Sequence, residues 1–254
     1  MDHACQHRFI SLVGYKNFIF DCYCAILCSK AAFQTLVRRG WMVYLTNDKF
    51  QYYIPALVRE FYVNAFYCYN DTYWVRDKEV VINAEVIQNY YGFPSTIDCL
   101  YRQYEMNVFT PDWDAVAKRL CFDSTSFCQR GLLRGTLTRQ STFWFHFVAH
   151  NVMPTSNASE MNKDHSFLIY CIMERKLVNL IAIIYDSIKR CINVKTKRAF
   201  AFPHLITELL LAIKVPIIDD EEQQQPRQPI KYHKMHAKSS RVEKSLVEQG
   251  EKVN

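Results

Sequence analysis

The sequence predicts a mainly α-helical single domain over residues 30–217, with one small β-hairpin and a disordered polar tail over residues 218–254. Through much of the chain, apolar residues recur at steps of three and four, as they do along the buried stripe of a helix. Glycine is scarce, with 6 in 254 residues, whereas a turn-rich all-β fold normally needs more. Hydrophobic residues make up 50% of the chain, which is enough for a substantial core.

The strongest helical pattern lies in residues 151–217, where we expect helices that begin near Asp164, Val178 and Pro203. The stripe of the second helix consists of Leu180, Ile181, Ile184, Ile188 and Cys191. The stripe of the third consists of Leu205, Ile206, Leu209, Leu210 and Ile213. Two such stripes so close in sequence must pack on each other or on a third surface to leave water.

Two helices are predicted upstream of this block. Residues 31–39 form a short helix that ends at Gly40. Residues 51–66 form a longer helix, and Pro55 fits its first turn, where a missing N–H is tolerated. Residues 1–29 mix aromatic and thiol side chains without helix caps, and they fit either a helix on the core or an extension.

A hairpin and a capped helix are expected next. The runs at residues 72–75 and 79–82 are rich in β-favouring residues, and three charged residues separate them. Asn83 then suits the N-cap of a helix, and Gly92 suits its end. These signals predict a strand, a turn, a strand and a helix in that order.

The following stretch contains two more predicted helices around a long connection. Thr110 followed by Pro111 predicts a helix that runs to about Cys121. Residues 121–135 form a connection in which Gly131 acts as a breaker, and residues 138–152 form an aromatic helix.

Charge and cysteine content limit the classes of protein that fit. The net charge is +6, and residues 1–218 hold 24 basic and 18 acidic residues, so the surplus lies before the tail. This balance permits contact with nucleic acid or acidic partners without requiring it. The 10 scattered cysteines indicate reduced thiols, which suits the nucleus or cytoplasm. We expect neither secretion nor a membrane span, because no signal peptide or sufficiently long apolar run is present.

Six phrases, in this order, resemble the "putative plant transposon protein" domain family. They are RRGW at 38–41, LVREFYVNA at 57–65, YYGFP at 90–94, VMPTSNASE at 152–160, KLVNLIAIIYDSIKRC at 176–191 and AFPHLIT at 201–207. The hairpin and the helix that ends in YYGFP are also similar, more distantly, to the plant mobile domain. The resemblance implies a plant source and a mobile-element origin. It supplies no catalytic residues to carry over and does not imply transposition activity.

No catalytic, metal or cofactor site is predicted. Two-metal strand transfer needs carboxylates gathered on a rigid scaffold. Here the acids fall at a hairpin turn, in first turns of helices or on a polar helix side: Asp77, Glu79, Asp112, Asp114, Asp164 and Asp186. His146 and His150 are four residues apart, a spacing that binds zinc, but their distance from Cys121 and Cys128 does not match a zinc finger. The spacing of Cys22, Cys24 and Cys28 also fits no standard metal or redox pattern.

The densest basic group surrounds the end of the second central helix. It consists of Lys189, Arg190, Lys195, Lys197 and Arg198. Such a group can bind phosphates, although cations near a helix C-terminus also offset its dipole. Arg130, Arg134 and Arg139 would extend the patch if the fold brings them close.

The favoured function is that of a non-catalytic interaction domain from a plant transposable element, which contacts nucleic acid or other element-encoded proteins. The alternatives are a component of the transposition machinery with an unrecognised nuclease or transposase activity, and a domesticated remnant without activity. The sequence predicts no cofactor, no membrane partner and no particular oligomeric state.

Overall fold

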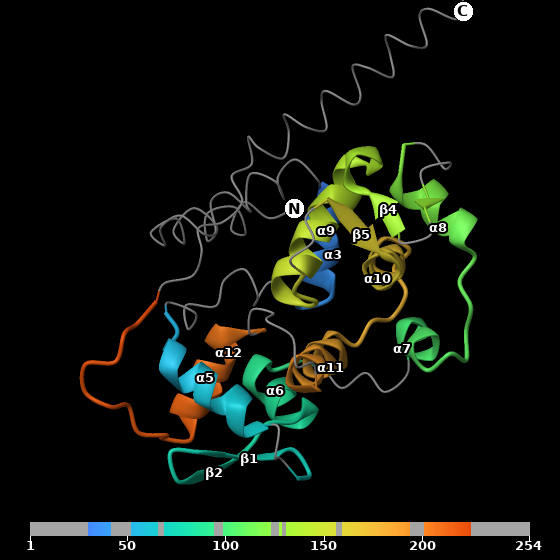
Figure 1. The fold of residues 1–254 in the computed structure, drawn as a ribbon. Helices are drawn as coiled ribbons and strands as arrows, with labels where there is room; N and C mark the ends of the chain where they lie inside the picture. Colours follow the sequence, from blue (N-terminus) through green and yellow to red (C-terminus); the bar gives the residue numbers. More distant parts are fainter. Residues whose placement is uncertain are drawn as a thin grey trace, which may run out of the picture.

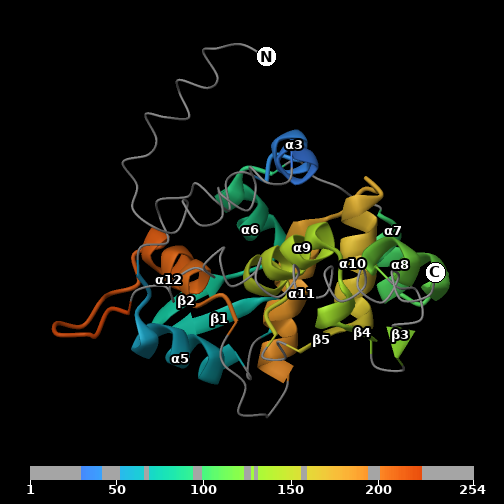
Figure 2. The ribbon, with the colours of Figure 1, turned by 90° about the horizontal axis from the view of Figure 1, so that it is seen from above.

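The computed structural model describes residues 30–41, 52–65, 69–93, 99–122, 127–128, 131–155, 159–193 and 201–224. The expectations for the N-terminal extension (residues 1–29) and for the tail from residue 225 onward lie outside these ranges. The described part is mainly helical, with two small antiparallel sheets, as Figures 1 and 2 show. Among these residues no helix combines the length and the apolar content that crossing a bilayer requires.

One end of the molecule contains the predicted hairpin. Strands β1 (Thr72–Val75) and β2 (Lys78–Val81) pair antiparallel and lie against helix α5 (Pro55–Asn64). Helix α12 (Pro203–Ala212) packs on α5, and α6 (Ala84–Tyr91) packs on α11 (Leu180–Asn193). We call this part the hairpin end (Figure 1).

The other end contains helices α8 (Trp113–Leu120), α9 (Arg139–Asn151) and α10 (Lys163–Met173). Both α8 and α9 pack on α10, and α10 also contacts the short helix α7 (Leu100–Glu105). Helix α3 (Lys30–Arg38) precedes Trp41, whose ring stacks on Phe147 of α9 at 6.2 Å between ring centroids. Helix α11 lies between the two ends in both views (Figures 1 and 2).

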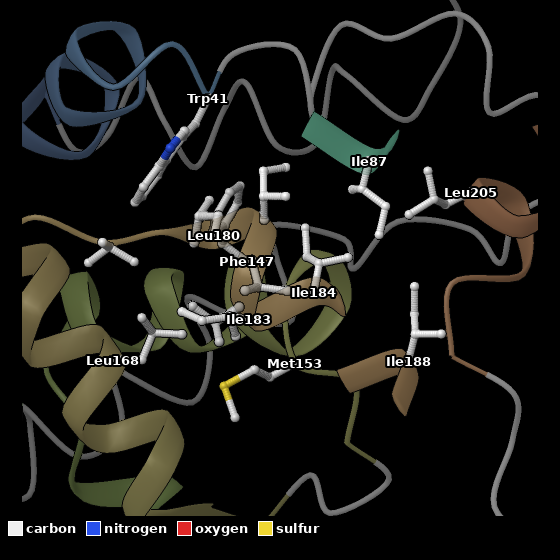
Figure 3. Packing of buried hydrophobic residues seen from close by; sticks show 14 of the residues in the cluster. Trp41, Ile87, Phe147, Met153, Leu168, Leu180, Ile183, Ile184, Ile188 and Leu205 are labelled. Carbon is white, nitrogen blue, oxygen red and sulfur yellow. The ribbon is translucent and has the colours of Figure 1, made fainter. Parts of the chain in front are cut away.

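A single apolar cluster runs through both ends of the molecule. The stripe predicted for α11 is buried, apart from its last member, Cys191, which is half-buried. Figure 3 shows the side chains of α11 between Leu168 of α10 and Leu205 of α12. Of the stripe predicted for α12, only Ile213 is exposed, because the helix ends just before it.

The capping signals identified several helix ends correctly. Asn83 accepts a hydrogen bond from the backbone N–H of Val86, and Gly92 adopts φ +70° after α6. Thr138 caps α9 through the N–H of Ser141, and Gly40 follows α3 with φ +69°. These local signals depend on few neighbours, which explains why the sequence alone reveals them.

The structure corrects the predicted start of α8. Asp112, not Thr110, is its N-cap, and its carboxylate accepts hydrogen bonds from the N–H groups of Asp114 and Ala115. The carboxylate accepts hydrogen bonds from two N–H groups that have no partner within the helix, and its negative charge interacts favourably with the positive end of the helix dipole. The helix therefore begins at Trp113.

The connection predicted over residues 121–135 contains strands. β3 (Phe127–Cys128), β4 (Gly131–Leu133) and β5 (Glu160–Asn162) form a three-stranded antiparallel sheet. A 3-10 turn, Arg134–Thr136, leads from β4 towards α9. The sheet escaped prediction because its strands have only two or three residues, too few for a period-two pattern.

The residues that follow residue 217, where the polar tail was predicted to begin, still contact the rest of the domain. Glu221 forms an ion pair with Arg76, and Gln224 pairs with Tyr53 through two backbone hydrogen bonds. The first residues of the predicted tail therefore lie on the hairpin end.

Candidate nucleic-acid interface

The structure places two of the five candidate cations. Lys189 and Arg190 lie near the C-terminus of α11, whereas Lys195, Lys197 and Arg198 fall in residues 194–200, outside the described ranges. Burial of the apolar stripe of α11 fixes the rotation of the helix, so Lys189 and Arg190 are turned away from the core. At the other end of the helix, the Asn179 side chain accepts a hydrogen bond from the N–H of Ala182.

Lys189 joins α11 to the base of the hairpin. Its ammonium donates a 2.5 Å hydrogen bond to the carboxylate of Asp71 and lies 5.4 Å from the centre of the Tyr185 ring. The hydrogen bond to Asp71 raises the pKa of Lys189. Burial alone would raise the pKa of Asp71, but the hydrogen bonds from Lys189 and Tyr185 and the charge of Lys189 lower it. The charge of Lys189 is therefore largely compensated.

Arg190 belongs to a mixed group of charges on α7 and α11. Its guanidinium lies 3.4 Å from the hydroxyl of Ser187. Beside it, Arg102 forms ion pairs with Asp186 and, at 3.2 Å, with Glu105. Burial and the nearby Asp186 raise the pKa of Glu105, while Arg102 and Arg190 lower it. Two cations and two carboxylates thus meet here, and little positive charge is left over.

Basic and acidic residues are also equal in number over the whole described part of the chain. Its ranges contain 17 basic and 17 acidic residues, whereas the full sequence contains 31 and 25. Residues 194–200 contribute three basic residues and no acidic one. Up to residue 218 the described residues contain 17 basic and 13 acidic residues, and the four acids at residues 219–222, which follow α12, make the two counts equal.

The arginines that were expected to extend the patch have other surroundings. Arg134 lies against α9, with Nη2 2.6 Å from Nε2 of His146. Arg139 begins α9, and Arg130 lies outside the described residues.

The His146 and His150 rings stack at 6.2 Å, with 9° between their planes. Burial, the charge of Arg134 and the neighbouring His150 lower the pKa of His146 to about 3. The thiol of Cys121 accepts a 3.6 Å hydrogen bond from Thr136. A nitrogen that faces a guanidinium is poorly placed to bind a cation.

The acids considered for a two-metal centre lie on separate elements. Asp164 accepts a 3.0 Å hydrogen bond from the Tyr104 hydroxyl, Asp186 pairs with Arg102, and Asp112 caps α8. Asp77 follows β1, and Glu79 lies opposite Trp74 in the hairpin. Within the described ranges, no three His, Cys, Asp or Glu side chains are grouped so as to hold a metal ion.

Comparison with protein families identifies a related domain. The family model described as "Putative plant retrotransposon-related domain" matches residues 37–216. These residues run from the end of α3 to just beyond α12, and they enclose both ends of the fold and the basic group. No curated protein and no solved structure matches the chain significantly.

Proposed function

Because the chain belongs to the family of putative plant retrotransposon-related domains, we propose that it is a non-catalytic module that binds nucleic-acid phosphates. The binding residues are the cations at and after the end of α11: Lys189, Arg190, Lys195, Lys197 and Arg198. Membership of the family gives the chain its origin in a plant transposable element, as the six sequence phrases predicted.

The proposal rests on the uneven distribution of charge along the chain. The described fold is electrically balanced, whereas three cations follow one another between α11 and α12 without an intervening acid. A local excess of this kind attracts a polyanion even when the net charge of the protein is modest. Lys189 and Arg190 shortly precede the same segment in the sequence.

The placement of the acids favours binding over catalysis. Three of the carboxylates considered above already have partners. Asp112 caps α8, Asp164 accepts a hydrogen bond from a tyrosine hydroxyl, and Asp186 pairs with a guanidinium. A nuclease would need several of them to converge on shared ions. The module therefore acts by holding its ligand.

Replacing Lys195, Lys197 and Arg198 together with glutamine is expected to weaken nucleic-acid binding roughly tenfold or more. The slope of log affinity against log salt should fall by about 2 to 3, since each phosphate contact with a duplex contributes about 0.9. Electrophoretic titration of a DNA duplex at several salt concentrations measures both quantities.

The matched control removes three cations elsewhere by the substitutions Arg59→Gln, Lys118→Gln and Arg175→Gln. All three residues are exposed, on α5, on α8 and just after α10. If binding depends only on total charge, the two triple variants will weaken equally, and the assignment to the end of α11 is wrong. An unchanged affinity in the first variant would leave a protein partner as the remaining candidate.

Asp71→Asn is expected to have the opposite effect and to strengthen binding a few-fold. The substitution frees the ammonium of Lys189, so the salt slope should steepen by about 1. Asp71 has φ +60°, which asparagine tolerates well. The lost ion pair is partly exposed, with 36% and 28% of the two side chains accessible, so the fold should lose less than about 1 kcal/mol. Weaker binding by this variant would show that Lys189 serves only to hold the hairpin.

A further inference from the structure

The β1–β2 hairpin has one face in the core and one face in solvent, at the lower margin of the molecule in Figure 1. The inward side chains are buried: Tyr73, Val75, Val80 and Ile82. On the other face Trp74 is 58% exposed and Val81 is 45% exposed, and Glu79 is exposed as well. Trp74 and Glu79 are directly opposite each other in the register, so the indole and the carboxylate are neighbours. We call Trp74, Glu79 and Val81 the outer face of the hairpin.

The alternation of bonded pairs fixes the direction of the main-chain groups in β2. At the base of the hairpin, the N–H of Ile82 donates a 3.1 Å hydrogen bond to the carbonyl of Asp71. Bonded and non-bonded pairs alternate along an antiparallel ladder, so the N–H and C=O groups of Glu79 and Val81 point away from β1. Among the described residues these groups make no hydrogen bond. Strand β2 therefore has an open outer edge.

The corresponding edge of β1 is covered. The side-chain amide of Asn64, at the end of α5, donates a 2.7 Å hydrogen bond to the carbonyl of Trp74. The N–H of Thr72 donates a 3.0 Å hydrogen bond to the carbonyl of Tyr69. These bonds and the packing of β1 on α5 hold the hairpin in place. A ligand at β2 consequently meets a preformed edge, which lowers the cost of binding.

The charges around the outer face are negative. The two cations of the hairpin are directed at the chain after α12: Arg76 pairs with Glu221, and the ammonium of Lys78 donates a 2.5 Å hydrogen bond to a carbonyl there. Asp77 and Glu79 are exposed, and neither forms an ion pair with a described residue. An exposed carboxylate beside an exposed indole suits a cationic side chain, because the ring face also attracts positive charge.

We propose that the outer face is a docking site for an extended, basic segment of a partner protein, which adds a strand to the open edge of β2. The main chain of the segment bonds to Glu79 and Val81. A lysine or arginine opposite Glu79 pairs with its carboxylate and reaches the ring of Trp74. An apolar residue two positions further along packs on Val81. None of these residues belongs to the proposed phosphate-binding group, so the two proposals stand or fall separately.

A second copy of the chain fits this edge less well than a basic segment does. Symmetric pairing of β2 with β2 would place two acidic outer faces on one continuous sheet, where the Asp77 and Glu79 carboxylates of both copies lack a balancing cation. A basic segment supplies that cation.

Fluorescence anisotropy of the full chain with a labelled peptide, short enough to form one strand, tests the site. In the peptide, lysine and valine alternate with threonine, and a second peptide carries glutamate in place of lysine. We expect the lysine peptide to bind and the glutamate peptide to bind roughly tenfold more weakly or less. Trp74→Ala should weaken the lysine peptide roughly tenfold or more, and Glu79→Gln should weaken it several-fold. Equal binding of the two peptides would overturn the proposal.

Two control variants remove the same kinds of group elsewhere. Leu177→Ala shortens an apolar side chain that is 67% exposed, and Asp114→Asn removes an exposed charge on α8. Both should bind the lysine peptide like the wild type. If they weaken it as much as Trp74→Ala and Glu79→Gln do, the peptide binds without a defined site and the proposal is wrong.

The edge itself is tested at Val81. Val81→Pro removes an outward N–H, and proline is tolerated at such edge positions, so binding should fall roughly tenfold or more. Val81→Thr keeps the N–H and should keep most of the affinity. Methylation of alternate peptide N–H groups makes the same test on the wild-type protein: one phase should block binding and the other should not. Binding that survives both changes would show that no strand is added, and a dimer that Trp74→Ala abolishes in sedimentation would make a second copy the occupant instead.

Discussion

Replacing Gly131 with alanine is expected to lower the free energy of unfolding by about 3 kcal/mol or more. Gly131 has φ +148°, a backbone conformation that other residues rarely adopt. An added Cβ would lie 2.0 Å from the carbonyl oxygen of Met161 and 2.9 Å from the Cα of Asn162. Both are main-chain atoms of the paired strand β5, so neither can move aside without breaking the β4–β5 pairing.

Gly135→Ala is the matched control for this prediction. Its added Cβ would meet nothing within 4 Å, so its effect should stay within about 0.5 kcal/mol. Urea unfolding of the two variants and the wild type, followed by circular dichroism, measures the difference. Equal stability of the two alanine variants would contradict the close approach of β4 and β5.

Gly131 also illustrates what the sequence leaves unknown. As one glycine in a connection, it predicts a break, because glycine favours turns wherever no partner is visible. In the structure it is the first residue of β4, and its partner in β5 is Asn162, 31 positions later. Because this partner lies so far along the chain, the local sequence around Gly131 does not reveal the pairing. The caps at Asn83 and Thr138, by contrast, satisfy N–H donors within three residues.

Helix α7 escaped prediction for a related reason. It has six residues and no side-chain cap, so neither length nor capping distinguishes it from a loop. Tyr101 is fully buried, and its ring lies 6.2 Å from that of Phe167 on α10. Tertiary packing therefore supports this helix, which agrees with the general weakness of short isolated helices.

The candidate interface could be located from the sequence only in part. The cations near the end of α11 are visible as a dense group, but the acid that neutralises Lys189 is Asp71, 118 positions away. Likewise, the sequence shows the acids of the tail but not that Arg76 binds Glu221, 145 positions away. Spacing along the chain reveals where cations gather, and only the fold reveals which of them are already paired.

Between pH 6 and 4 the protein is expected to lose stability steeply, and His146 should account for about 2 kcal/mol of this loss. Four histidines of the described fold have lowered pKa values, all mainly because of burial: His146, His150, His165 and His204. For His146 the pKa falls to about 3, compared with about 6.5 in an unfolded chain. The unfolded state therefore binds a proton below pH 6.5 that the folded state does not. Between its two pKa values, such a histidine lowers the free energy of unfolding by about 1.4 kcal/mol for each unit by which the pH falls.

His146→Gln tests the assignment, because an amide oxygen can still accept the hydrogen bond that Arg134 now directs at Nε2. Unfolding free energies measured from pH 7.5 to 4 should fall less steeply for this variant than for the wild type. His165→Gln is the comparison: the ring nitrogens of His165 lie 2.6 Å from Oδ1 of Asn162 and 2.8 Å from the carbonyl oxygen of Met153. These acceptors favour the protonated ring and counteract the lowering of its pKa by burial. Replacing His165 should therefore change the slope of unfolding free energy against pH less. A larger change of slope for His165→Gln would mean that His165, and not His146, accounts for more of the stability lost at low pH.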